Sequence, residues 1–192
     1  AQPAESGAAP ERKMVSGSPD AVRTVTGSNA GKQAAAAEEP YVVGETAFAT
    51  LAEALEAVTE EKAGIVLQAD AEETEKVNIE KTVTICLNGH NISLASGKNI
   101  IIGSGAAVII QGDGQQGTDG KVAGNITAYA GTALTVENCT VEGQLTAHGS
   151  STVTDSLVTS TKSPAFTVNN QNAAVKLSGS LFLFTGTPSG SG

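Results

Sequence analysis

The stretch that decides the fold is residues 50–92, which read TLAEALEAVTEEKAGIVLQADAEETEKVNIEKTVTICLNGHNI. Apolar residues at helical spacing come first, followed by a buried strand, GIVLQAD, and by short strands around an Asn-Gly turn. A helix with one apolar face and no helical partner in sequence must cover a sheet or the end of a coil of strands. This order predicts a solenoid of short strands that begins with a capping helix.

The capping helix is predicted to cover residues 50–62. Thr50 followed by Glu53 is a capping box, Lys62 suits the negative end of the helix dipole, and Gly64 suits the exit. The apolar stripe that the helix must bury consists of Phe48, Leu51, Leu55 and Val58.

Two sets of repeats come after the helix. The segments TALTVEN, STVTDSL and AAVKLSG align at spacings of 19 and 22 residues, which places in one column Leu134, Val153 and Val175. The segments NITAYAG, QLTAHGS and AFTVNNQ align at spacings of 19 and 21 residues, which places in a second column Ile126, Leu145 and Phe166. Each segment alternates with period two, so one side of every strand points inward, and stacked turns make one continuous core.

We therefore expect an all-β solenoid, a parallel β-helix of about six rungs over residues 41–184. The alternative is an antiparallel β-sandwich, which would need several two-residue hairpin turns, and only Asn88-Gly89 qualifies. Residues 1–40 are rich in Ala, Gly, Ser and Pro, and we expect a disordered linker or tail there. By composition, residues 185–192 are a linker or an appended tail.

Several phrases of the chain resemble a known kind of module. TLAEALEAV, IVLQAD and IEKTVTICLNGHNI, with the later GTALTVENCTVEG and AFTVNNQNAAVKLSG, resemble right-handed parallel β-helix modules of the pectate-lyase-like architecture. The resemblance is greatest to modules of secreted and surface proteins from Gram-positive gut bacteria, and it covers roughly 41–184. It implies an extracellular or cell-surface location, further modules in the same polypeptide, and host or cell-wall glycans as partners. Where such modules usually carry an acidic residue, this chain has Cys86.

The overall charge limits the possible partners. The chain has 11 Lys and Arg against 20 Asp and Glu, a formal net charge of -9, which argues against nucleic acid as a partner. No apolar run has the length needed to span a bilayer, so we expect no membrane insertion. The cysteines Cys86 and Cys139 are more than two turns apart, and we expect no disulfide between them.

The candidates for catalysis are few. Polysaccharide lyases and glycosidases need a strong base or two carboxylates on neighbouring rungs. Residues 41–192 contain no Arg, and Glu137 and Asp155 are 18 residues apart, a spacing that could put them on adjacent rungs. We interpret these two as solvated turn acids, and they remain weak catalytic candidates.

The candidates for metal binding are equally weak. Asp113 and Asp119 lie in the Gly-rich stretch QGDGQQGTDG, where carboxylate and carbonyl oxygens could bind Ca²⁺. With only two acids we interpret the stretch as a surface loop, and we expect no cofactor and no metal. His90 and His148 lie in turns without a second ligand at a suitable spacing in sequence.

These observations favour a non-catalytic, secreted or cell-surface β-helix module that acts as a stiff spacer or as an adhesive, carbohydrate-interacting face. The alternative is a small polysaccharide lyase or glycoside hydrolase, or an inactive remnant of one. The two hypotheses differ in whether a glycan is bound or degraded.

Overall fold

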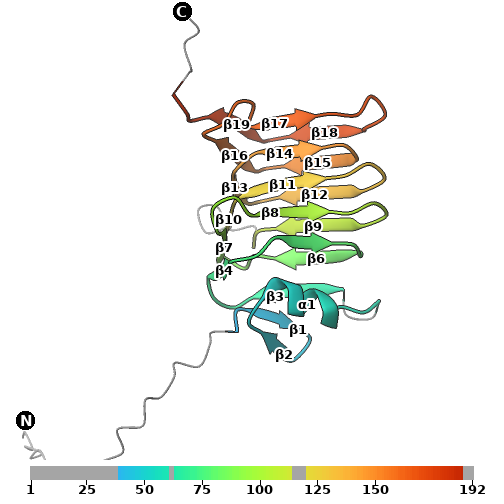
Figure 1. Ribbon diagram of the computed structural model, residues 1–192, viewed down its shortest axis with the longest axis vertical. Coiled ribbons are helices and arrows are strands. Elements are labelled where there is room, and N and C mark those ends of the chain that lie inside the picture. Colours follow the sequence, from blue (N-terminus) through green and yellow to red (C-terminus); the bar gives the residue numbers. More distant parts are fainter. Residues whose placement is uncertain (1–38, 61–62, 114–119, 188–192) are drawn as a thin grey trace, which may run out of the picture. The chain divides into compact units, whose positions relative to one another are not determined.

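The computed structural model describes residues 39–60, 63–113 and 120–187. Most of the predicted tails 1–40 and 185–192, namely residues 1–38 and 188–192, lie outside the described residues, as does the predicted helix-end residue Lys62. The described chain is a parallel β-solenoid of about five turns with a single short helix (Figure 1). The predicted β-solenoid is confirmed, although the number of complete turns is five rather than six. The alternative of a β-sandwich is wrong, because strands of neighbouring turns pair in parallel.

Three sheets form the walls of the solenoid, and each turn contributes one strand to each sheet. The eight-stranded sheet contains, from turn to turn, β3 (Gly64–Leu67), β6 (Val83–Cys86), β9 (Ala107–Gln111), β12 (Ala133–Glu137), β15 (Ser150–Thr154) and β18 (Val175–Ser178). The six-stranded sheet contains β4 (Ala71–Glu73), β7 (Asn91–Leu94), β10 (Lys121–Ala123), β13 (Thr140–Glu142), β16 (Leu157–Ser160) and β19 (Leu181–Phe184). The five-stranded sheet contains β5 (Val77–Ile79), β8 (Asn99–Ile102), β11 (Asn125–Ala128), β14 (Leu145–Ala147) and β17 (Phe166–Val168).

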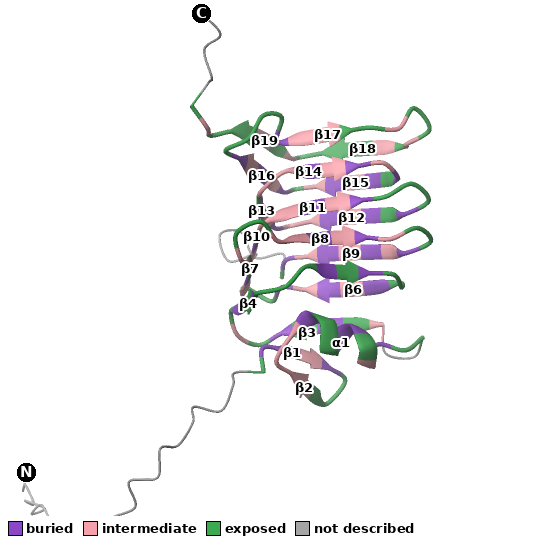
Figure 2. Cartoon of the chain, viewed as in Figure 1, coloured by how far each residue is buried: buried purple, intermediate pink, exposed green. Residues whose placement is uncertain are grey.

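The core is a set of aliphatic columns that run along the inside of the three sheets. In the eight-stranded sheet one fully buried column consists of Ile65, Ile85, Ile110, Val136 and Val153. In the five-stranded sheet the predicted column is confirmed residue by residue, because Ile126 pairs with Leu145 and Leu145 with Phe166. Each turn buries its inward side chains against the same kind of side chain above and below it, as Figure 2 shows by the purple strands of the middle turns.

The other predicted column is partly wrong. Leu134 pairs with Ser151, and Ser151 pairs with Val175, whereas Val153 pairs with Val136. The predicted alignment was therefore two residues out in its middle segment. A shift of two residues keeps the same side of a strand facing inward, so the alternation of side chains does not reveal it.

The turns differ in length. Successive residues of the column from Ile65 to Leu177 are separated by 20, 25, 26, 17 and 24 residues, against a predicted period of about twenty. The strands themselves stay three to five residues long, so the corners between sheets take up the difference. One of these corners is Asn88-Gly89, where both residues have positive φ, 50° and 79°.

The N-terminal end is closed by a hairpin and a helix. β1 (Tyr41–Val43) pairs antiparallel with β3 and with β2 (Thr46–Phe48), and α1 (Leu51–Ala57) contacts both hairpin strands and β5. The predicted capping box is present, since the Thr50 hydroxyl accepts from the Glu53 amide and the Glu53 carboxylate accepts from the Thr50 amide. The helix is shorter than the predicted 50–62. Phe48 belongs to β2, and the extended backbone of Val58, with φ −67° and ψ 127°, ends the helix.

Two polar side chains attach this cap to the first turns. Glu73, only 4 % exposed, accepts a hydrogen bond of 2.8 Å from the Leu51 amide at the start of the helix. Lys81 donates to the carbonyls of Leu55 and Val58 at its end, at 2.9 and 3.3 Å, in the role predicted for Lys62. Burial, and secondarily the neighbouring Glu73 carboxylate, raises the pKa of the Tyr41 hydroxyl well above its usual range.

The cysteines are placed as predicted. Cys86 and Cys139 form no disulfide; Cys86 is half-buried on the wall and Cys139 is buried at a corner.

Replacing Leu55 by Asp should lower the free energy of unfolding by about 3 kcal/mol or more, because a carboxylate would replace an apolar side chain that is 5 % exposed in the core. Chemical denaturation followed by circular dichroism measures the change. The exposed neighbour Glu56, replaced by Ala, is the control. An unfolding midpoint of Leu55→Asp equal to that of the wild type would show that the helix does not pack against the first turn.

Replacing Ser151 by Ala should raise the free energy of unfolding by about 1 kcal/mol. Ser151 is 2 % exposed in an aliphatic column, and its hydroxyl has no hydrogen-bond partner among the described residues. Ser150→Ala, at the exposed neighbouring position, should leave the stability unchanged. A loss of stability in Ser151→Ala would mean that the hydroxyl is satisfied in solution.

Candidate functional site

The outer face of the five-stranded sheet carries a column of hydroxyl groups. Thr127, Thr146 and Thr167 pair in register on β11, β14 and β17, and all three are half-buried with outward side chains. Because paired strands lie about 4.8 Å apart, these hydroxyl groups form a regular line across three turns. We call the outward side of β11, β14 and β17 the threonine face. A hollow lies at each of its two edges.

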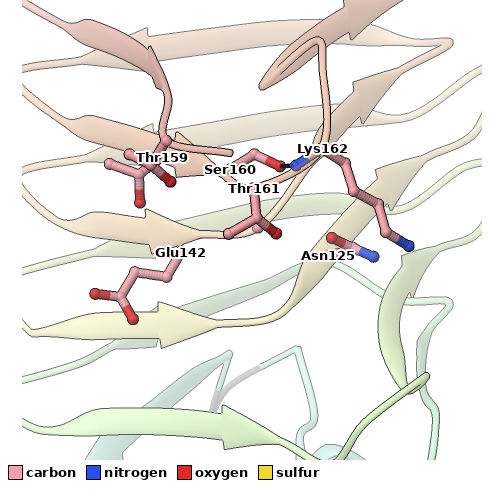
Figure 3. A pocket seen from close by; sticks show the side chains of 8 residues that line it. Asn125, Glu142, Thr159, Ser160, Thr161 and Lys162 are labelled. Carbon is pink, nitrogen blue, oxygen red and sulfur yellow. Dashed lines mark hydrogen bonds between the residues drawn. The ribbon is translucent and has the colours of Figure 1, made fainter. Parts of the chain in front are cut away.

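The first hollow is a groove at the corner between the six-stranded and five-stranded sheets. It has a volume of about 490 Å³ and is lined by Asn125, Glu142, Gly143, Thr159, Ser160, Thr161, Lys162 and Thr185. Figure 3 shows the amide of Asn125 and the ammonium of Lys162 on one side and the carboxylate of Glu142 on the other. The Lys162 amide donates to the Ser160 hydroxyl at 3.0 Å, which fixes the start of the loop that overhangs the groove.

The charge of the groove is balanced locally. The Lys121 ammonium lies 3.0 Å from the Glu142 carboxylate in an ion pair that runs between neighbouring turns. Gly143, at the back of the groove, has no room for a Cβ atom, which would collide with the carbonyl of Gly124 in the turn below. The groove therefore presents hydroxyl, amide and ammonium groups around one paired carboxylate.

The second hollow, which we call the tyrosine notch, lies on the outer side of β5 and β8 and reaches the corner between the five-stranded and eight-stranded sheets. Its volume is about 320 Å³, and its lining consists of Lys76, Asn78, Glu80, Ile101, Gly103 and Tyr129. Backbone hydrogen bonds from Gly103 to Ile79 and from Tyr129 to Ile102 place one turn above another at this corner. In three successive turns the residue that follows the strand is Glu80, then Gly103, then Tyr129. Because Gly103 has no side chain, the space between Glu80 and Tyr129 stays open and forms the notch.

An exposed aromatic ring forms the upper wall of the notch. Tyr129 is 46 % exposed, and its ring centroid lies 6.0 Å from that of His148 in the next turn, with the rings tilted by 40°. The side-chain amide of Asn170 donates a hydrogen bond of 2.7 Å to the backbone carbonyl of His148 and so holds His148 in place. Stacked against His148, Tyr129 offers an aromatic surface beside polar groups.

One strand connects the two hollows. β11 begins at Asn125, which lines the groove, carries Thr127 on the threonine face, and is followed directly by Tyr129 in the notch. Four residues of extended chain span about 13 Å. The groove, the threonine face and the tyrosine notch therefore form one polar surface with an aromatic group at its edge. This surface is long enough for an extended ligand.

The weak catalytic candidates occupy neighbouring turns. Glu137 pairs in register with Thr154, and Asp155 is the next residue. The Asp155 carboxylate leans over Gly179 in the following turn, where an added Cβ would collide with it, and so it points away from the turn of Glu137. Neither residue lines the groove or the notch.

The weak metal candidates are only partly described. Asp113 is the last residue before the gap in the description, and Asp119 lies outside the described residues. Among the residues that the structure describes, no group of three or more His, Cys, Asp or Glu side chains is placed to hold a metal ion. The expectation that this stretch is a surface loop stays a prediction.

A polar cluster that sequence spacing did not reveal joins two turns. The Asp70 carboxylate accepts from the Asn91 amide at 2.9 Å and from the Asn91 side chain at 3.2 Å, and it lies 3.7 Å from the His90 ring nitrogen. The hydrogen bonds from the backbone and the side chain of Asn91, in that order, lower the pKa of Asp70 below 3.8. Sequence reasoning found no acid near His90, because Asp70 is twenty residues away and only the register brings them together.

The Asp70 carboxyl should titrate with a midpoint below 3.8 in the folded protein, as measured by the carbon chemical shift of the carboxyl group. Because the pKa is lowered on folding, the stabilisation is present above the unfolded pKa and is lost as the pH falls through the folded pKa. Asn91→Ala should move the midpoint back toward the unfolded value. A midpoint at or above 3.8 in the wild type would contradict the hydrogen bonds between Asp70 and Asn91.

None of the helices in the described ranges has the length and apolar character required to cross a membrane. Comparison with protein-family models, with curated proteins and with solved structures finds no match to this chain.

Proposed function

We propose that this domain is a rigid, non-catalytic module that binds an oligosaccharide on the threonine face, between the groove and the tyrosine notch. The observation that carries the proposal is that β11 joins a polar groove, a line of hydroxyl groups and an exposed tyrosine on one surface. Sugars offer both hydroxyl groups and apolar ring faces. A protein surface that recognises them combines hydrogen-bonding side chains with an aromatic ring.

The chemistry of the surface favours neutral or amino sugars. Asn125, Thr127 and Asn78 can donate and accept hydrogen bonds, and Ile101 and Tyr129 offer apolar contact. The overall charge of -9 disfavours uronic and sialic acids. An amino or N-acetylamino group could approach Glu80 in the notch.

The architecture supports a passive role. Stacked turns hold the outer side chains at fixed spacings, so the face is ordered before a ligand arrives. Glycoside hydrolysis requires two carboxyl groups on either side of the scissile bond, whereas each hollow offers one. The alternative function, a small polysaccharide lyase or hydrolase or a remnant of one, would have to use Glu137 and Asp155 on a different surface.

The setting of the module belongs to the same proposal. We place it outside the cell or on the cell surface, next to further modules of the same polypeptide, with host or cell-wall glycans as ligands. Kinship with pectate-lyase-like modules of Gram-positive gut bacteria also remains a proposal, motivated by phrases such as TLAEALEAV and IEKTVTICLNGHNI. The fold itself is compatible with many functions.

The experiment is a binding screen of soluble neutral, N-acetylated and uronic oligosaccharides, followed by calorimetric titration of those that bind. We expect a neutral or N-acetylated oligosaccharide to bind, and Tyr129→Ala to weaken binding at least tenfold, which corresponds to about 1.4 kcal/mol. Gly103→Gln should also weaken binding, because the new side chain enters the notch. No binding by any member of the panel would overturn the proposal.

Gly64→Gln is the matched control for Gly103→Gln, because a Cβ at Gly64 meets no atom within 4 Å and the residue lies on a different sheet. It should bind like the wild type. Chromatography of the oligosaccharides after long incubation distinguishes binding from degradation. Cleavage that is abolished by Glu137→Gln or Asp155→Asn would replace the proposal by its alternative.

A further inference from the structure

The C-terminal turn exposes several large apolar side chains. Of seven large hydrophobic side chains that are exposed among the described residues, five lie on β17, β18 and β19, namely Val168, Leu177, Leu181, Leu183 and Phe184. Leu177 and Phe184 pair with the buried residues Val153 and Ser160, so they point inward, and no further turn of the described chain covers them. Figure 2 shows the change from purple to green at this end. The core of the solenoid therefore continues to the surface there.

The strands of this turn also have free edges. Among the described residues, β17, β18 and β19 each pair with one strand and are the last strands of their sheets. Hydrogen bonds at the corner between the eight-stranded and six-stranded sheets link each turn to the next one. The Ser156 hydroxyl accepts from the Cys139 amide at 3.4 Å, and the Ser180 hydroxyl accepts from the Ser156 amide at 3.2 Å. Within the described residues, no hydroxyl from a further turn reaches the Ser180 amide. Free edges of this kind recruit another strand.

The opposite end of the solenoid has a free edge as well, in the same sheet. β2 is the outermost strand of the eight-stranded sheet at the N-terminal end, and within the part of the chain that the structure describes its one partner is β1. Beside it is a groove of about 630 Å³ lined by Ala47, Phe48, Ala49, Ala57, Glu39, Glu53 and Glu56. This N-terminal groove has an apolar floor and three carboxylates.

The two ends carry opposite charge. Residues 157–187 contain Lys162 and Lys176 and no acidic residue, whereas the N-terminal groove is lined by acids and no base. Contact between two C-terminal ends would bring like charges together. Contact between a C-terminal end and an N-terminal end would pair lysines with glutamates and cover apolar side chains on both sides.

We propose that a second copy of this chain is the partner of the C-terminal turn, docked head to tail. In this arrangement β18 of one copy pairs with the free edge of β2 of the next, so that the eight-stranded sheet continues through the contact. Leu177 and Phe184, at the open end of the core, lie against the N-terminal groove. A head-to-tail contact does not close on itself unless the rotation between copies allows a ring, so association should proceed beyond dimers. The contact uses the ends of the solenoid, whereas the proposed oligosaccharide-binding face lies on the outer side of the five-stranded sheet.

Sedimentation velocity of the full chain over a wide range of concentration tests the proposal. We expect the average sedimentation coefficient to rise with concentration past the value of a dimer, and to fall when salt is raised, because the charges are partly screened. Phe184→Glu should abolish the rise. Tyr129→Glu is the control, since Tyr129 is similarly exposed but lies on a middle turn. Circular dichroism melting curves check that both variants are folded.

Charge reversal identifies which ends meet. Lys176→Glu and Glu56→Lys should each weaken association at least tenfold, and a mixture of the two single variants should recover it in part by forming mixed dimers. A monomer at every concentration overturns the proposal. Association that stops at the dimer and is unchanged in Glu56→Lys also overturns it, in favour of contact between two C-terminal ends.

Discussion

Hydrogen bonding between parallel strands of neighbouring turns is the interaction on which the rest of this structure depends. Each strand obtains both of its backbone partners from the turns on either side, and the inward side chains are brought into register by the same pairing. In the middle of the solenoid both edges of every strand therefore have hydrogen-bond partners. The outermost described strands at the two ends lack a partner turn on one side, so each end must be covered in another way.

At the N-terminal end the solution is built from polar contacts. The buried carboxylate of Glu73 holds the first amide of α1, and the ammonium of Lys81 holds its last carbonyls, so both ends of a seven-residue helix are fixed to the solenoid. Such a short helix would be unstable alone. Its place over the first turn results from these contacts and from the burial of Leu51 and Leu55.

The local sequence pattern was enough to predict the architecture. Prediction failed for features that depend on which residues of neighbouring turns pair with each other. Alternating side chains and the column through Ile126 indicated the solenoid and one wall of its core. The pairing of Ser151 with Leu134 was missed because a polar residue in an aliphatic column looks like a turn residue. The candidate site was missed for a similar reason. Tyr129 was visible as an isolated aromatic, but its position above Gly103 depends on a spacing of 26 residues that no repeat in the sequence displays.

The unequal lengths of the turns indicate where the chain can accept insertions. Because the register of the strands is kept while 17 to 26 residues separate successive turns, extra residues at a corner are extruded without altering the core. Insertions between sheets should accordingly be inherited more easily than substitutions within a strand. A lineage of such domains can diversify its corner loops while it conserves the walls. The same property makes the corner after β16 a suitable place to graft a foreign peptide for display.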